Sequence, residues 1–348
     1  MKIFDYGKYA DAKWNGRILS YVARIQEFKG RQGLFMQQKP SELTRLVELA
    51  KIQSTEASNK IEGIATVRSR LRQLYSDKTT PRTRDEKEII GYRDVLNTIH
   101  ENHDYISVSA SYILQLHRDL YAYSEKAIGG KFKSVQNYIS ETAADGRSFV
   151  RFTPLAPYET PSAVDSLCDE YNKAISRCDV EPLVLIPIFV LDFLCIHPFN
   201  DGNGRMSRLL TTLLLYRSGY FIGKYISIES KIEKTKQEYY DALKSGSEGW
   251  RENANDPSEF IEYFLSVVLA AYRDFEDRVD IVGVQRMSGA QTVEAAVRNT
   301  LGKFTKRDIM ELCPDLSKAT VENALSVLVR DGFIERYGTG KATYYVKK

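Results

Sequence analysis

The 348-residue chain has few cysteines and no marked excess of charge of either sign. Its cysteines are irregularly spaced and include no Cys-x-x-Cys pair, which argues against a disulfide framework and a thiolate zinc site. They are Cys168, Cys178, Cys195 and Cys313. Forty-nine lysines and arginines face 46 acidic residues, so the net charge of +3 indicates neither a nucleic-acid-binding surface nor an acidic tail. These features favour a reducing, cytoplasmic location.

No apolar run in the sequence is long enough for a membrane span, and we expect no secretion signal. The N-terminal stretch MKIFDYGKYADAKW includes acidic residues and lacks the apolar region of a secretion signal. The long apolar run at residues 182–196 contains Pro187 and Asp192 and falls short of the roughly 20 residues that a membrane-spanning helix needs. We therefore expect a buried core helix at 182–196 and no membrane partner.

Apolar residues recur at spacings of three and four along most of the chain, which predicts a mainly α-helical protein. We expect Ser41 and Ser107 to be the N-caps of two helices, and the first of these helices to end near residue 63. Further helices are predicted at 161–175, 182–196, 204–218, 229–245 and 257–279. One segment departs from this pattern. Residues 134–154 contain strand-like runs on either side of Ala144-Asp145-Gly146, which predicts a β-hairpin that we call the flap.

The C-terminal residues have their own pattern. A linker is predicted over 282–290, and a small second domain over 290–348. Within it we expect helices at 293–301, at 306–312 with Thr305 as cap, and after Ser317, followed by strands at 333–337 and 342–346. Three helices and a terminal hairpin are typical of a winged helix-turn-helix. The expected division is therefore an N-terminal helical region, 1–106, a core, 107–281, and this small domain.

The segment HPFNDGNGRMSR, residues 197–208, carries the strongest functional signal. Pro198 forces a turn after the buried helix, and Gly202 and Gly204 permit the positive φ angles that let backbone N–H groups converge on an anion. The next helix directs its N-terminal dipole to the same place. Arg205 and Arg208 are three residues apart, so we expect them to share a helix face and bind further phosphate oxygens.

The same segment supplies a candidate metal ligand and a candidate general base. Asp201 precedes the glycines, and one carboxylate supplemented by phosphate oxygens and water is a common way to hold Mg²⁺. A free imidazole titrates near neutral pH, so we expect that His197 can accept a proton from an attacking hydroxyl. Phe199 is expected to be a hydrophobic pin. Each residue alone is an ordinary turn former, but together they favour a site for ATP and Mg²⁺.

These twelve residues resemble the signature of the Fic family, HPFx(D/E)GNGRxxR, at every specified position. The resemblance extends from about residue 40 to 280 and implies a Fic-type helical bundle with a β-hairpin flap, followed by a winged-helix domain. It also implies a protein adenylyltransferase, which moves AMP from ATP to a Ser, Thr or Tyr hydroxyl of a target protein, this chain included. The flap would bind the target as an added strand. By position, the resemblance implies His197 as base, Asp201 as Mg²⁺ ligand, Gly202, Asn203 and Gly204 as α-phosphate contacts, and Arg205 and Arg208 as contacts to the outer phosphates. Lys133 departs from the arginine that many members carry ahead of the flap.

A second family resemblance lies upstream. Ser58 and Glu62 share a helix face, and Gly63 is suited to end that helix. Taken alone, Glu62 is an ordinary solvated residue. The segment 58–63 resembles the family's inhibitory motif (S/T)xxxE(G/N), which implies that Glu62 pairs with Arg208 and keeps the γ-phosphate from binding productively.

Other reactive side chains have simpler interpretations. His100 and His103 lack a third metal ligand, so we expect them at a solvated helix end. His117 is expected to be packed and hydrogen-bonded. Cys195 lies within an apolar run and is expected to belong to the core.

Two alternatives to AMP transfer remain open. The same site could remove AMP, with Glu62 positioning a water. The chain could instead be an ATP-sensing regulator whose C-terminal domain binds DNA through Lys318 and Arg330. Residues 290–348 contain ten basic and seven acidic residues, so DNA and protein are equally open as partners of that domain. A homodimer is open as well.

Overall fold

The computed structural model describes residues 2–38, 40–75, 79–125, 128–142, 147–283, 288–300 and 302–347. The described chain is mainly helical, as predicted, and carries two separate two-stranded antiparallel sheets. It divides into two compact units, the first comprising Met1–Arg31 with Leu43–Tyr272 and the second Gln32–Glu42 with Arg273–Lys348. The predicted boundary at 106/107 falls inside the first unit, and the three-domain division stays a prediction.

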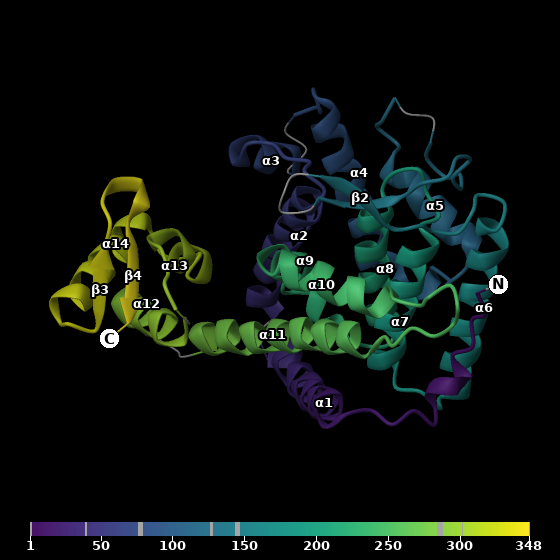
Figure 1. Ribbon diagram of the computed structural model, residues 1–348. Coiled ribbons are helices and arrows are strands. Elements are labelled where there is room, and N and C mark those ends of the chain that lie inside the picture. The colour runs from purple at the N-terminus through teal and green to yellow at the C-terminus, as the bar shows by residue number, and fades with distance from the viewer. Residues whose placement is uncertain are drawn as a thin grey trace. The chain divides into compact units, whose positions relative to one another are not determined.

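Helices dominate the first unit (Figure 1). The α-helices from the N-terminus to residue 283 are α1 (Gly16–Gln38), α2 (Pro40–Ile61), α3 (Arg68–Tyr75), α4 (Arg84–Asn102), α5 (Ala110–Leu120), α6 (Thr160–Arg177), α7 (Pro182–Ile196), α8 (Asn203–Arg217), α9 (Ile228–Lys234), α10 (Lys236–Ser247) and α11 (Ser258–Gly283). Three short 3-10 helices lie between them: η1 (Gly7–Tyr9), η2 (His103–Tyr105) and η3 (Phe221–Lys224).

Most predicted helices are confirmed, but three details were wrong. Helix α2 begins at Pro40, so Ser41 lies inside its first turn. The N-cap of α5 is Ser109, whose Oγ accepts a hydrogen bond from the backbone N–H of Tyr112, and not Ser107. The predicted helix 229–245 is two helices that meet at Thr235, because its hydroxyl bonds the Lys231 carbonyl and the chain leaves helical geometry there.

Helices α7 and α8 lie side by side within the first unit (Figure 1), and the loop 197–202 joins them. Helix α7 has the bounds that its apolar run predicted, and its residues from Leu183 to Phe193 are all buried. Helix α8 is buried on nearly every side as well. The loop between them is therefore anchored at both ends in the core.

Helices α4 and α5 come into close contact at Gly91. A Cβ added to this glycine would collide with the backbone carbonyl of Leu120 on α5. The absence of a side chain at Gly91 therefore sets how closely the two helices pack. This matters for the site, because α4 and the end of α5 both supply side chains beside the loop 197–202.

We expect Gly91→Ala to destabilise the first unit by about 1–3 kcal/mol, because the added methyl group must force α4 and α5 apart. Urea denaturation would measure this loss. Gly30→Ala is the matched control, since Gly30 also lies inside a helix but an added Cβ there meets nothing within 4 Å. The control should be neutral or stabilising by about 0.5–1 kcal/mol. Equal stability of the two variants would refute the packing argument.

The flap is present as a β-hairpin of β1 (Ile139–Thr142) and β2 (Ser148–Phe152), with a register shift between Ile139 and Ser140. The predicted turn at 144–146 lies outside the described residues. An ion pair of 3.0 Å between Glu141 and Lys244 connects the flap to α10. Phe149 and Val150 on β2 are exposed.

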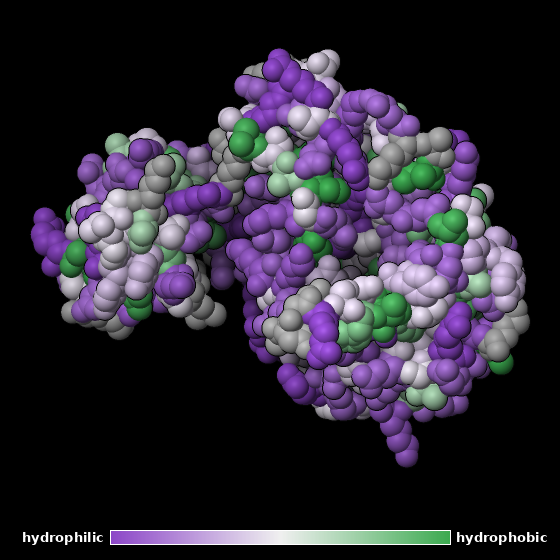
Figure 2. Space-filling view, turned by 45° about the horizontal axis from the view of Figure 1, so that its top comes forward, coloured by the Kyte–Doolittle hydropathy of each residue, from purple (hydrophilic) through white to green (hydrophobic). Residues whose placement is uncertain are grey.

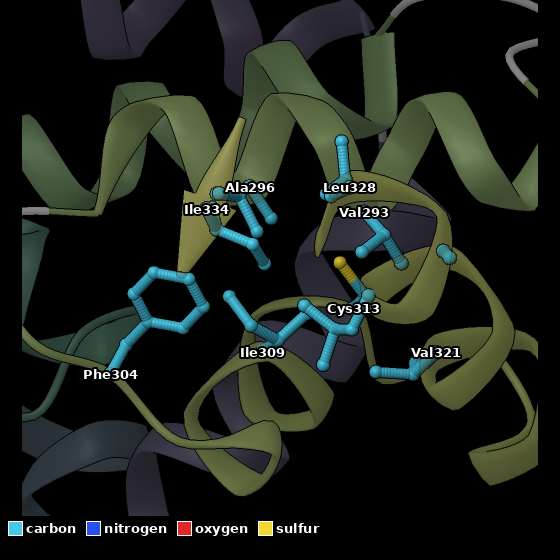
Figure 3. Packing of buried hydrophobic residues seen from close by; sticks show 11 residues of the cluster. Val293, Ala296, Phe304, Ile309, Cys313, Val321, Leu328 and Ile334 are labelled. Carbon is cyan, nitrogen blue, oxygen red and sulfur yellow. The ribbon is translucent and has the colours of Figure 1, made fainter. Parts of the chain in front are cut away.

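Within the second unit, the described residues from 288 to 347 form three α-helices and a terminal hairpin, in the predicted order. They are α12 (Gly289–Asn299), α13 (Lys306–Leu312), α14 (Lys318–Arg330), β3 (Ile334–Tyr337), the 3-10 helix η4 (Gly340–Ala342) and β4 (Tyr344–Lys347). Thr305 and Ser317 cap α13 and α14, as predicted. Figure 3 shows side chains from all three helices, with Phe304 and Ile334, gathered into one hydrophobic core. The assignment as a winged helix-turn-helix stays a prediction.

The predicted linker at 282–290 is shorter than expected. Helix α11 extends through Gly283, and Ser288 caps α12 with a capping box that includes Gln291. Residues 284–287 lie outside the described part of the chain.

The face of the protein in Figure 2 is mostly hydrophilic, with small separate groups of hydrophobic residues. Among the described helices, none is both long and apolar enough to cross a bilayer.

Candidate active site

A cavity of about 260 Å³ lies beside the loop 197–202 in the first unit. Its polar side is formed by the loop, the start of α8 and Glu62. Its apolar side is formed by the flap, α7 and α10. The lining residues are Glu62, Ile139, Arg151, Phe152, Leu191, Leu194, Cys195, His197, Asn200, Asp201, Gly202, Asn203, Gly204, Arg208, Tyr239, Tyr240, Leu243 and Ser247.

His197 ends α7 in a left-handed backbone conformation, with φ of 50°. Its Nδ1 lies 3.2 Å from the Leu194 carbonyl oxygen, which can only accept, so Nδ1 carries the proton. Burial is the main cause that lowers the pKa of His197 to about 4; Lys133 contributes to this lowering, whereas the Leu194 carbonyl and Glu62 oppose it. At neutral pH the ring is therefore uncharged, with a basic Nε2, as a general base requires.

Two side chains ahead of the flap hold the turn after His197. The buried Lys133 donates through Nζ to the Ile196 carbonyl at 2.9 Å, and its backbone N–H donates to the Pro198 carbonyl at 2.8 Å. Asn137 donates to the carbonyls of His197 and Phe199 at 3.1 and 3.0 Å. The side chain of Lys133 thus satisfies the Ile196 carbonyl oxygen at the end of α7 and also donates to Asn137. No motif in the sequence pointed to Asn137.

The middle of the loop is fixed by stacking and by one asparagine. The rings of His117 and Phe199 are parallel, with centroids 3.6 Å apart, and Phe199 is fully buried, which confirms it as a hydrophobic pin. His117 accepts from the Gly130 N–H at Nδ1, so its Nε2 donates to the Asp201 carbonyl at 3.0 Å. The side chain of Asn203 accepts from the Phe199 N–H and donates to the Phe199 carbonyl. Its predicted contact with an α-phosphate stays a prediction.

The two glycines serve different purposes. Gly202 has a φ of 87°, as predicted for a residue that turns the chain before α8. Gly204 was expected to share this property, but it lies within the first turn of α8 and is helical. A Cβ at Gly204 would collide with the carboxylate of Glu62, so its missing side chain makes room for that group. The N-terminal N–H groups of α8 face no helical acceptor, as at any helix start.

Arg208 is held by the end of α2. Its Nε donates to the Ser58 hydroxyl at 2.7 Å, and its Nη2 donates to the Ser58 carbonyl at 2.9 Å and to Glu62 Oε1 at 2.7 Å. Gly63, with φ of 78°, follows Glu62 and closes the helix end, as predicted. The structure thus brings Ser58 and Glu62 to Arg208 on one side of the cavity.

Arg205 does not lie beside Arg208. It is almost completely buried, is not among the described residues that line the cavity, and pairs through Nη2 with Glu88 of α4 at 2.8 Å. The same nitrogen donates to the Tyr121 hydroxyl at 2.7 Å. Two residues three apart on a helix differ by about 60° in direction, and at this helix end that difference separates the cavity from the α4–α5 interface. The predicted contact of Arg205 with outer phosphates has no support in this geometry.

Asp201 lies at the rim of the cavity, with 41% of its side chain exposed. Its carboxylate oxygens lie 3.9 Å from Arg205 and 4.0 Å from Arg84. Within the described ranges, no group of three or more His, Cys, Asp or Glu side chains is placed to hold a metal ion. A metal bound at Asp201 would therefore need ligands from a nucleotide and water.

A sequence model of the Fic/DOC family matches residues 107–215. This segment is similar to the Fic domain. It starts just before α5, contains the flap, α6, α7 and the loop 197–202, and ends within α8. Ser58 and Glu62, which contact Arg208, lie outside the matched segment.

Relatives of the Fic domain include protein adenylyltransferases. The chain is 28% identical over 185 residues to protein adenylyltransferase fic-1 of Caenorhabditis elegans, which covers 52% of this chain and 32% of that protein. It is 26% identical over 259 residues to protein adenylyltransferase Fic of Culex quinquefasciatus, covering 71% of this chain and 47% of that protein. The matches thus span less than half the length of these distant relatives.

The fold is similar to the crystal structure of a Fic family protein from Desulfovibrio desulfuricans G20, with a TM-score of 0.65. The two chains are 22% identical, and the superposition covers 97% of each. This likeness confirms the predicted fold class, a mainly helical Fic fold with a β-hairpin and a C-terminal hairpin region.

Side chains outside the Fic signature give a mixed result. His117 is packed and fully hydrogen-bonded, and Cys195 is buried, as predicted. His100 was expected in solvent, but it is buried against Tyr216 on α8, with ring centroids 5.4 Å apart. Tyr239 and Tyr240, which line the apolar side of the cavity, were missed because α10 carries no motif.

Proposed function

We propose that this chain is a protein adenylyltransferase, and the observation that carries the proposal is the neutral, cavity-lining His197 opposite Arg208. In the proposed step, a target hydroxyl oxygen forms a bond to the α-phosphorus of ATP. The hydroxyl proton passes to His197 Nε2, the bond from the α-phosphorus to the bridging oxygen breaks, and pyrophosphate leaves. The target then carries AMP on a Ser, Thr or Tyr side chain.

The two sides of the cavity suit the two parts of ATP. An apolar surface for the adenine base is formed by Leu191, Leu194, Leu243, Tyr239 and Tyr240. The start of α8 offers N–H groups and a positive dipole end for phosphates. Asp201 fits Mg²⁺ as a partly exposed carboxylate next to this helix start, and the ion would supply charge neutralisation of the phosphates.

We further propose that the protein is autoinhibited by Glu62. Its carboxylate satisfies Arg208 and fills the space next to Gly204, so it occupies the place where a γ-phosphate would reach the guanidinium. A nucleotide whose outer phosphate cannot reach Arg208 binds with its α-phosphate displaced from His197.

The experiment that tests the proposed function follows the fate of each phosphate. Glu62→Gly protein with Mg²⁺ and a mixture of candidate target proteins is expected to incorporate label from [α-³²P]ATP and none from [γ-³²P]ATP. Mass spectrometry would then identify the adenylylated side chain, on this chain or another. Incorporation from the γ-position would instead show phosphate transfer, and label in neither case would contradict the proposal. Release of AMP from a pre-labelled target would reveal the reverse reaction.

We propose no DNA-binding function for the second unit. Lys318 lies 4.0 Å from Glu322 and Arg330 lies 3.3 Å from Asp331, so both of the cations predicted to contact DNA have an acidic neighbour.

A further inference from the structure

Arg205 belongs to the Fic signature yet is buried in a polar cluster on the far side of the loop from Arg208. The cluster consists of Arg84 and Glu88 from α4, Tyr121 after α5, and Arg205 from α8. Glu88 has 1% of its side chain exposed, as does Arg205. A buried carboxylate without cationic partners would be strongly destabilising. The ion pairs of Glu88 with Arg84 and Arg205 are therefore what allows its charge to be buried.

Tyr121 connects the cluster to the loop. Its ring lies against Gly202, where an added Cβ would approach it to 3.0 Å. Its hydroxyl accepts a hydrogen bond from Arg205 Nη2 at 2.7 Å. Tyr121 thus touches Gly202, the residue that turns the chain, and also contacts Arg205.

Glu88 balances the two guanidinium groups that face Asp201. Oε1 of Glu88 accepts from Arg84 at 2.8 Å, and Oε2 lies 2.8 Å from Arg205. The same two arginines lie 4.0 and 3.9 Å from the carboxylate of Asp201. Without the charge of Glu88, both cations would be drawn toward Asp201 and would compete with any other cation for it.

We propose that Glu88 and Tyr121 are positioning residues that keep the Asp201 carboxylate oriented and available to Mg²⁺. They act through Arg205, which contacts both of them and lies 3.9 Å from Asp201. This inference rests on the proposed function, because it assigns Asp201 to the metal. It gives Arg205 a role that does not need contact with phosphate.

Glu86 provides a matched control on the same helix. It is also buried and ion-paired, through Arg70 at 2.7 Å, but this pair lies away from the loop. Glu86→Gln and Glu88→Gln therefore both remove the charge of a buried, ion-paired carboxylate from α4. Only Glu88→Gln removes the negative charge that pairs with Arg205.

The test measures Mn²⁺ binding by electron paramagnetic resonance, with a non-hydrolysable ATP analogue and Glu62→Gly protein as the parent. Glu88→Gln is expected to weaken Mn²⁺ binding about tenfold, the lower end for residues that orient a metal ligand, while Glu86→Gln leaves it unchanged. Glu88→Asp should recover part of the loss. Thermal unfolding of each variant reports any general damage. Tyr121→Phe, which keeps the ring over Gly202, provides a milder variant should Glu88→Gln fail to fold, and it too should weaken Mn²⁺ binding.

Equal Mn²⁺ affinity in the parent, Glu88→Gln and Tyr121→Phe would overturn the inference, as would an equal loss in Glu86→Gln. A parent that binds no Mn²⁺ with the analogue would overturn the proposed function itself, so the two failures are distinguishable.

Discussion

Replacing Glu62 with alanine or glycine is expected to raise the rate of AMP transfer by roughly 10- to 100-fold. The estimate follows from the hydrogen bonds that Arg208 would regain for the nucleotide, since a bond to a charged group contributes about 1.5–3 kcal/mol. The Glu62 carboxylate lies 2.7 Å from Arg208, and in the proposed mechanism it is the group that a γ-phosphate must displace. The measurement is the initial rate of α-phosphate label entering protein at fixed ATP and Mg²⁺.

The controls separate charge from helix disruption. Glu62→Ala retains helix propensity at the end of α2, whereas Glu62→Gly does not, so activation by both variants would assign the effect to the missing carboxylate. Lys60→Ala changes the same turn of the helix but removes only an exposed ion pair with Glu233, and should alter the rate less than twofold. Activation by Lys60→Ala equal to that by Glu62→Ala would contradict the assignment of Glu62 as the inhibitory group.

Adding His197→Ala to the Glu62→Ala protein is expected to lower the transfer rate by roughly 10²- to 10⁴-fold, the usual contribution of a general base. His103→Asn is the matched control, because His103 packs on Tyr216 and Phe221 away from the cavity. A double variant that transfers AMP as fast as Glu62→Ala would rule out His197 as the base.

The pH dependence of the same reaction tests the electrostatics of His197. Above its pKa of about 4 the ring is neutral and can accept a proton, and below it the ring is charged and cannot. The kcat/KM of Glu62→Ala should therefore show no loss attributable to this group between pH 8 and 6, and should fall only as the pH approaches 4. Because Glu62 raises the pKa of His197, its removal shifts this fall to still lower pH. A midpoint near 6.5 would contradict the burial of the ring.

The local features of the sequence predicted local structure well. Helix α7 could be bounded because its apolar run starts at a proline and ends where Pro198 restricts the preceding residue. The positive φ of Gly202 and Gly63 followed from their places at a helix start and a helix end. The signature also brought His197 and Asp201 to one cavity, as expected.

Tertiary partners decided what the sequence could not predict. Arg205 and Arg208 look equivalent by spacing, but Glu88 and Tyr121 draw one into the interior while Ser58 and Glu62 hold the other at the cavity. Gly204 looked like a second turn residue, but it lies in the first turn of α8, and its missing side chain makes room for the Glu62 carboxylate. His100 looked solvated because Tyr216, which covers it, is distant in sequence.

The left-handed backbone of His197 limits how far the twelve-residue signature could function by itself. That conformation costs a residue with a side chain roughly 1–2 kcal/mol, and in this protein the bonds from Lys133 and Asn137 to the adjacent carbonyls hold the turn in place. A free peptide of residues 197–208 would relax out of this shape. Grafting the signature onto another protein would therefore require the partners ahead of the flap to be transplanted with it.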